Sequence, residues 1–251
     1  MKKIVSFALW GELDNYIVGA IQNAKDVKKY YPGWVARFYC GRSVPNQIIE
    51  RLKSEDAEVI IKDEAGDNRG MFWRFEPIDD EDVERVIVRD VDSRISSREC
   101  EAVQEWVESG LTGHIMRDHP YHNMVILGGM WGCLGGGVVK IKDNIKEFKP
   151  LNERNQDQLF LAEYVYPVLI RKGCLIHDSF FRYESFSRDF PSEREEDLSF
   201  VGEQIDANGQ RSCPWMAIQE FNESLLVRIK FRYKRLKRKI KNKIIGRHMV
   251  I

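Results

Sequence analysis

Two aspartates spaced for divalent-cation binding follow the apolar run Val86–Val88. On extended backbone Asp90 and Asp92 would point the same way, and paired carboxylates repel each other unless a cation lies between them. A hard divalent ion accepts such oxygen ligands and keeps positions open for phosphate oxygens. An isolated Asp-x-Asp is more often a solvated turn. Here the preceding strand and the flanking Arg89 and Arg94, which could grip phosphate, favour a metal–diphosphate site.

Other polar side chains could contribute to such a site. Arg74 lies in the aromatic block Met71–Phe75, so if buried it needs an anionic partner, either a phosphate or a neighbouring carboxylate. Three histidines between residues 114 and 122 have poor spacing for zinc, and we expect them, with Asp118, to line a polar pocket. Glycines at positions 128 and 129 would let the backbone approach a ligand closely.

Two later segments carry further candidates. Asp157 falls in the first turn of a predicted helix, where the helix dipole alone would favour an acid. The segment Cys174–Ser179 reads as a short strand that ends in His177 and Asp178. A lone His-Asp pair is a weak signal, but His177 becomes a possible third ligand for a metal already held by two carboxylates.

The hydrophobic pattern predicts the elements that position these residues. A β-α-β-α-β order within the first 61 residues indicates a parallel sheet covered by helices, and ligands bind at the carboxyl ends of the strands in such sheets. Strands are predicted at 4–9, 34–39, 57–61, 86–88, 125–127 and 174–176, and helices at 15–31, 44–54, 97–109 and 155–166. The segment 190–207 is acidic and reads as a loop or an edge segment.

The net charge of zero hides two opposed parts. Eleven Lys and Arg lie between Arg228 and Arg247, and the sequence has no acid after Glu223. Residues 1–227 hold the remaining 28 basic against 39 acidic side chains, a net charge of −11. From residue 222, apolar residues recur at three- and four-residue steps among the basic ones, which predicts a basic amphipathic helix. An anionic membrane surface, nucleic acid or the acidic body itself could be its partner, and its apolar face favours the membrane surface over nucleic acid.

The sequence also predicts a location. Five cysteines without a C-x-x-C pair are typical of reduced thiols in a cytosolic protein. The apolar run near the N-terminus stops at Gly11, short of a signal sequence. We therefore expect a cytoplasmic protein, peripheral at the inner face of a membrane, with one domain at residues 1–221 and a basic helical tail at 222–251.

Taken together, the motifs resemble those of GT-A type glycosyltransferases, and in particular of small bacterial and viral glycosyltransferase-like proteins. The resemblance covers roughly residues 4–205. It is carried by Met71–Phe75, Arg89–Arg94, Met116–His122, Gly128–Gly132, Asp157-Gln158 and His177–Ser179. It implies a Rossmann-like α/β fold, with a mostly parallel sheet flanked by helices, and a transferase that uses a nucleotide-diphosphate sugar.

The resemblance also implies roles for individual residues. Asp90, Asp92 and His177 would bind Mn2+ or Mg2+, and Asp157 and Asp118 would act on donor or acceptor hydroxyls. Asp157 would be the general base in an inverting enzyme and would position the donor in a retaining one. The nucleotide sugar, by resemblance a UDP-sugar, would contact Ser6, Leu9, Trp10, Tyr16, Arg74, Arg89, Asp90, Val91, Asp92, Arg94, Gly129 and His122. The acceptor would be a saccharide or a lipid-linked glycan.

Two other readings fit the same residues. A metal-dependent nucleotidyltransferase or phosphohydrolase also uses carboxylates and a divalent ion, although such enzymes usually need more carboxylates around two metals. A non-catalytic, membrane-peripheral protein could bind carbohydrate or nucleotide without turnover. The product released from a nucleotide sugar, or its absence, distinguishes the three.

Overall fold

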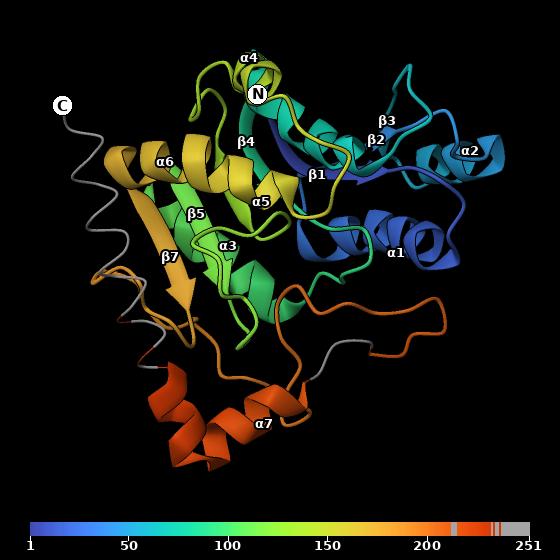
Figure 1. Ribbon diagram of the computed structural model, residues 1–251. Coiled ribbons are helices and arrows are strands. Elements are labelled where there is room, and N and C mark those ends of the chain that lie inside the picture. Colours follow the sequence, from blue (N-terminus) through green and yellow to red (C-terminus); the bar gives the residue numbers. More distant parts are fainter. Residues whose placement is uncertain (212–214, 232, 234–235, 237–251) are drawn as a thin grey trace.

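The computed structural model describes residues 1–211, 215–231, 233 and 236. Its centre is a seven-stranded sheet with the order β3-β2-β1-β4-β6-β5-β7 (Figure 1). The strands are β1 (Lys2–Leu9), β2 (Val35–Cys40), β3 (Glu58–Ile61), β4 (Val83–Val88), β5 (Gly113–Arg117), β6 (Trp131–Leu134) and β7 (Cys174–Asp178). All neighbouring pairs are parallel except those that β6 makes with β4 and β5. The predicted fold class, a mostly parallel sheet flanked by helices, is confirmed.

Helices cover both faces of this sheet (Figure 1). Alternate residues of each buried strand point to opposite faces, so each face has its own apolar core. In β4, Ile87 packs in one core with residues of α1, α2 and α3, whereas Val86 and Val88 pack in the other with residues of η1, α4 and α5. The elements are α1 (Asp14–Tyr30), α2 (Asn46–Ser54), α3 (Ser97–Ser109), the 3-10 helix η1 (Asn68–Asp79), α4 (Ile141–Phe148), α5 (Gln156–Phe160), the π-helical turn η2 (Leu161–Val165), α6 (Tyr166–Lys172) and α7 (Met216–Glu223).

The strand order reverses beside β1. The chain proceeds from β1 outward to β2 and β3, and then returns to place β4 on the other side of β1. Such a reversal leaves a crevice at the carboxyl ends of the two central strands, and that is where open α/β sheets bind ligands. Trp10 follows β1 and Asp90 follows β4 at this point, as the sequence predicted.

The structure corrects one predicted strand. Residues 125–127 lie in an irregular, bent loop, and the strand β6 begins at Trp131, after the glycines rather than before them. Because β6 is antiparallel to β4, Trp131 lies opposite Val88 at the carboxyl end of that strand. The glycines at 128 and 129 therefore lie at the same edge of the sheet as Asp90. They do so because they precede an antiparallel strand, whereas the sequence predicted that they follow a strand.

The C-terminal part is described only in its first turns. Residues 225–231, 233 and 236 are helical, and the rest of the predicted basic helix lies outside the described residues. The predicted boundary between residues 221 and 222 falls inside α7. Within the described part of the chain, every helix is too short or too polar to cross a bilayer.

Candidate functional site

The two aspartates lie in a tight turn directly after β4. Val91, between them, is 7% exposed and packs in the core on the side of α1, so the flanking carboxylates are directed away from that core. The Asn23 side chain fixes the turn by donating to the carbonyl oxygens of Val91 at 3.0 Å and Ser93 at 2.9 Å. Ser93 Oγ in turn donates to the carbonyl oxygen of Asp90 at 2.9 Å. The backbone thus holds both carboxylates in place before any ligand binds.

Asp90 is close enough to Asp92 for its charge to affect the ionisation of Asp92. Burial raises the pKa of Asp92 to about 6, and the charge of Asp90 contributes to the rise. Gln204 Nε2 donates to Asp92 Oδ2 at 2.6 Å and partly offsets this effect. The Asp90 side chain is 46% exposed. The protein therefore presents a negatively charged pair that a cation from solvent can reach.

Arg74 joins Asp90 to a third carboxylate. Its Nη1 donates to Asp90 Oδ1, and its Nη2 donates to Asp157 Oδ2 at 2.7 Å. Arg74 is only 6% exposed because η1 packs its neighbours Phe72 and Phe75 into the core. The sequence left open whether a phosphate or a carboxylate would balance this buried arginine, and the structure shows two carboxylates.

The glycine pair lies directly against these carboxylates. A Cβ atom built on Gly128 would be 2.1 Å from Asp157 Oδ2, and one on Gly129 would be 2.2 Å from Asp90 Oδ2. Contacts that short do not occur, so any side chain at either position would displace an aspartate. The requirement for glycine here comes from the close approach of the backbone to the site.

Tyr16, from α1, lies close enough to the aspartate pair for their charges to affect its hydroxyl. Burial raises the pKa of its hydroxyl, as do the charges of Asp92 and Asp90, whereas the exposed Arg154 lowers it. The sequence predicted Tyr16 but missed Arg154 and Gln204. Gln204 reaches the site because residues 204 and 205 pair with the turn after β4, where Ile205 N donates to Asp92 O at 2.8 Å. No local pattern marks such a pairing between distant segments.

The predicted base-pocket residues divide into two groups. Ser6 and Leu9 are buried inside the sheet, with exposures of 0% and 1%, and Leu9 belongs to the core on the α1 side. Trp10 is partly exposed, and its ring packs edge-on against Trp73 with centroids 6.3 Å apart. Of the three, Trp10 has the surface that a nucleotide base could contact.

Arg89 and Arg94 have local roles in this structure. Arg89 is 1% exposed, and its Nε donates to Glu99 Oε1 at 2.6 Å beneath α3. It follows the alternation of β4, so its side chain enters the face opposite to Asp90, which corrects the expectation that it grips phosphate. Arg94 is half-buried, and its Nη1 donates to the carbonyl oxygen of Ser93 at 3.1 Å.

A second polar cluster gathers the predicted residues Asp118 and His122. Asp118 is fully buried and accepts from Arg98 Nε at 2.9 Å, Ser179 Oγ at 2.7 Å and Arg194. His122 Nδ1 accepts from the backbone N–H of Asp118, and burial lowers the pKa of His122 to about 3. These contacts tie the loop around residues 190–201 to the sheet, and they leave Asp118 enclosed, contrary to the expectation that it acts on a substrate hydroxyl.

The structure also does not bring His177 to the aspartates. Its Nδ1 lies 2.9 Å from His114 Nε2, and its Nε2 lies 3.0 Å from Glu105 Oε2 beneath α3. In the described residues, no three His, Cys, Asp or Glu side chains converge closely enough to hold a metal ion. The prediction that His177 is a third metal ligand is therefore wrong, and His177 is a buried structural histidine. Among the described residues, the proposed metal site has the two carboxylates of Asp90 and Asp92 as its protein ligands.

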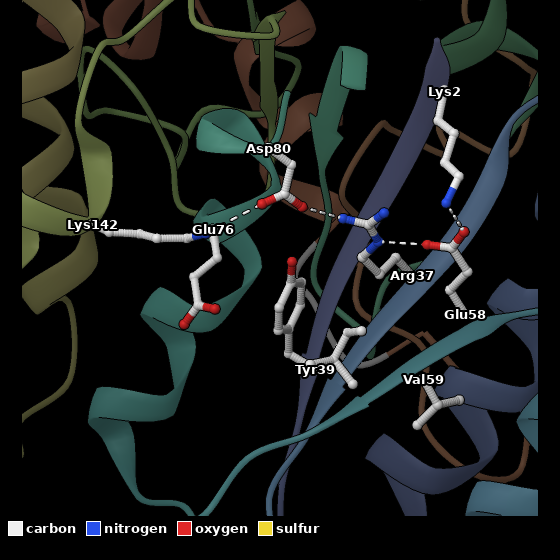
Figure 2. Close-up of a pocket in the computed structure, with 9 residues that line it drawn as sticks. Lys2, Arg37, Tyr39, Glu58, Val59, Glu76, Asp80 and Lys142 are labelled. Carbon is white, nitrogen blue, oxygen red and sulfur yellow. Dashed lines mark hydrogen bonds and ion pairs between the residues drawn. The ribbon is translucent and has the colours of Figure 1, made fainter. Parts of the chain in front are cut away.

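A separate hollow of about 550 Å³ lies away from the predicted site residues (Figure 2). Its charged groups already pair with one another. Arg37 donates to Glu58 at 2.7 Å and to Asp80 at 2.6 Å, while Lys2 and Lys142 bind the same two carboxylates at 2.7 and 3.2 Å (Figure 2). This network ties β1, β2 and β3 to the end of η1 and to α4.

Comparison with known proteins gives structural neighbours only. No protein-family model and no curated protein sequence match this chain. Similar solved structures include a glycosyltransferase involved in glycosylation of the major capsid of PBCV-1, with 14% identity, a TM-score of 0.47 and coverage of 73% of this chain and 82% of that one. A Pyrobaculum calidifontis mannosyltransferase in complex with GDP-Man and Mn2+ has 9% identity and a TM-score of 0.46, with coverage of 71% of this chain and 55% of that one.

A third neighbour is glucosyl-3-phosphoglycerate synthase from Mycobacterium tuberculosis, in complex with Mn2+, UDP-glucose and phosphoglyceric acid. Its identity is 10% and its TM-score 0.46, over 70% of this chain and 69% of that one. The identities of these three structures to this chain are 14% or lower and their TM-scores are below 0.5, so no activity of this chain follows from the likeness.

Replacing Arg89 tests its structural role. Arg89→Met would leave the buried Glu99 without its cation, and we expect a loss of about 3–5 kcal/mol in the free energy of unfolding, measured by urea denaturation. Neutralising the partner in the double variant R89M/E99Q should recover at least about 1 kcal/mol of that loss. An R89M protein as stable as the wild type would contradict this assignment.

Replacing Asp92 tests the charge repulsion at the site. Burial and Asp90 raise the pKa of Asp92 in the folded state, so the folded protein binds its proton more tightly than the unfolded chain does. This carboxylate therefore costs stability increasingly as the pH rises from about 4 to 6, the values of its unfolded and folded pKa. D92N should be about 1–2 kcal/mol more stable than the wild type at pH 7.5, with the gain vanishing near pH 4.

The measurement is urea unfolding in EDTA at both pH values. Asp63→Asn is the matched control, because the Asp63 side chain is 95% exposed and its replacement should leave stability unchanged at either pH. If D92N were destabilised at pH 7.5, the carboxylate would be stabilising the apo fold, which would contradict a cost of its charge from burial and from Asp90.

Proposed function

We propose that this protein is a glycosyltransferase that moves a sugar from a nucleotide-diphosphate sugar, a UDP-sugar by resemblance, to a saccharide or lipid-linked glycan acceptor. One observation carries the proposal. Four separate segments that share the glycosyltransferase resemblance meet around one carboxylate pair: the turn after β4, Arg74 from η1, the glycines at 128 and 129, and Asp157 from α5. These contacts bring together residues up to 83 positions apart in the chain.

The chemistry of Asp90 and Asp92 fits a divalent cation. Mg2+ and similar hard ions are commonly bound through one or two carboxylates and complete their coordination with substrate phosphates and water. A partly exposed carboxylate pair, in which one pKa is raised to about 6, gains from a cation at this position. When bound, Mn2+ or Mg2+ would neutralise the negative charge that develops on the leaving diphosphate.

Arg74 is the fixed cation of the proposed site. It is already desolvated and held by two carboxylates, so it orients Asp90 at no further cost when substrate binds. Asp157 is 5% exposed, and its oxygens accept from Arg74 and from the backbone N–H of Gln158 at 2.8 Å. Both carboxylate oxygens are therefore engaged, and we assign Asp157 a positioning role through Arg74.

The donor would lie between β1 and the aspartate turn. Trp10 offers its ring to the base, and Tyr16 offers a hydroxyl next to the carboxylates. The exposed Arg154 is near enough to affect the Tyr16 hydroxyl, so it replaces Arg89 as the candidate for a phosphate contact. Because the glycines at 128 and 129 have no side chains, the carboxylates of Asp157 and Asp90 can lie directly against their backbone.

A nucleotide-sugar assay with Mn2+ tests the proposal. We expect the full-length protein to release nucleoside diphosphate from at least one member of a panel of UDP-, GDP- and dTDP-sugars, with the UDP series first. D92N should lose about 100-fold or more of this rate, because the cation stabilises the leaving group by several kcal/mol. The exposed Asp63→Asn variant is the control and should keep the wild-type rate.

The same assay separates the competing functions. Release of nucleoside monophosphate, pyrophosphate or inorganic phosphate would indicate a nucleotidyltransferase or phosphohydrolase and would overturn the proposal. Binding of nucleotide without metal dependence and without any product would indicate a non-catalytic binding protein.

A further inference from the structure

An exposed apolar stripe runs along the helix that follows α7. Its members are Leu225, Leu226, Ile229 and Leu236, which are 63, 72, 50 and 58% exposed. At about 100° per residue, their positions fall within one arc of roughly 100° on the helix surface. Single exposed leucines are ordinary on protein surfaces, but four on one helical face form a patch of the kind that marks a binding surface.

A different residue attaches this helix to the body. The ring of Phe231 packs against Phe181 and Phe221, with centroids 5.5 and 5.2 Å apart, and Phe221 packs against Phe180 at 4.9 Å. Phe231 lies about 120° or more around the helix from every member of the stripe. The helix is therefore held by one face and presents its leucines on another.

The attachment point lies at the same edge of the sheet as the proposed site. Phe180 and Phe181 directly follow β7, where their backbone N–H groups donate to Asp178 Oδ1 at 2.9 and 2.7 Å. Since β7 runs in the same direction as β4, both strands end at one edge. Figure 1 shows α7 beyond the carboxyl end of β7.

The sequence around the stripe selects its partner. From Arg228 to Arg247 there are eleven Lys and Arg, and no acid follows Glu223. A second copy of the same basic segment would be repelled by it, and nucleic acid offers little apolar surface to cover leucines. An anionic lipid surface satisfies both features, because it attracts the charges and accepts apolar side chains below its headgroups.

We propose that this helix binds an anionic membrane surface, lies in the plane of the interface and turns the carboxyl edge of the sheet toward the lipid. Leu225, Leu226, Ile229 and Leu236 enter the acyl boundary, and the basic side chains contact the headgroups. The proposal stands independently of the transferase function, because it depends only on the exposed stripe and its charge.

Vesicle flotation with the full-length protein tests it. We expect binding to vesicles of phosphatidylcholine and phosphatidylglycerol (7:3) in 0.1 M NaCl, little binding to phosphatidylcholine alone, and a several-fold loss in 0.5 M NaCl. The double variant L225Q/L226Q keeps the charge unchanged. Its partition coefficient should fall at least about tenfold, because two buried leucines are lost.

The matched control is V139Q/L151Q, which replaces two apolar residues that are 60 and 56% exposed elsewhere on the surface. It should bind like the wild type. Equal binding of L225Q/L226Q and the wild type would show that charge alone acts, as in nucleic-acid binding, and would overturn the proposal. Equal binding to neutral and anionic vesicles, or a dimer in light scattering that L225Q/L226Q abolishes, would overturn it as well.

Discussion

The placement of Asp92, largely withdrawn from water and next to the charged Asp90, is the constraint around which this structure is organised. Two carboxylates are held side by side at the end of a buried strand, and the rest of the molecule supplies their support. Asn23 and Ser93 fix the turn, Arg74 balances one charge from beneath, and Gln204 donates to the other. Burial, and after it the charge of Asp90, makes the charged form of Asp92 costly, which is seen in its raised pKa. Because the charged form of Asp92 is unfavourable in the protein alone, a divalent cation that arrives with a diphosphate would be stabilised at this position.

Much of this arrangement could be predicted from the sequence because it follows from the alternation of strands. An apolar run of β-branched residues placed β4 in a buried sheet, and the β-α-β order placed its carboxyl end at the ligand edge. The i, i+2 spacing predicts that Asp90 and Asp92 point the same way; in the structure they lie in the turn after β4, with Val91 between them packed in the core. The same alternation directs the Arg89 side chain under α3, so its pairing with Glu99 follows from the strand register. The predicted phosphate contact of Arg89 considered its charge but not that register.

The remaining site could not be predicted because it depends on contacts between distant segments. His177 follows a strand as a metal ligand might, yet His114 on the neighbouring strand β5 and Glu105 on α3 engage both of its ring nitrogens. Asp118 lies in a polar motif, but it is enclosed by ion pairs with Arg98, which precedes it in the sequence, and with Arg194, which follows it. The short β6 was misplaced because a glycine-rich approach to an antiparallel strand has the same composition as the end of a parallel one. Gln204 carries no local signal at all.

The two proposals together assign the acidic body and the basic tail different tasks. The acidic body concentrates carboxylates where a cation and a diphosphate would meet, and the basic tail begins on the loop that ends β7, at the same edge of the sheet. A polar acceptor that is attached to a lipid would reach the carboxyl edge from that side. The two parts are joined through aromatic packing of Phe181, Phe221 and Phe231, which sets the tail's first turns against the body.

The central claim is that Asp90 and Asp92 bind a divalent cation together with a diphosphate and not through a third protein ligand. Electron paramagnetic resonance of Mn2+ measures this directly, because the sharp six-line signal of the free ion disappears on binding. We expect weak Mn2+ binding to the protein alone, binding at least about tenfold tighter when UDP is present, and no such gain in D92N. Mn2+ binding that is equally tight with and without UDP, or a UDP-dependent gain that persists in D92N, would contradict the account.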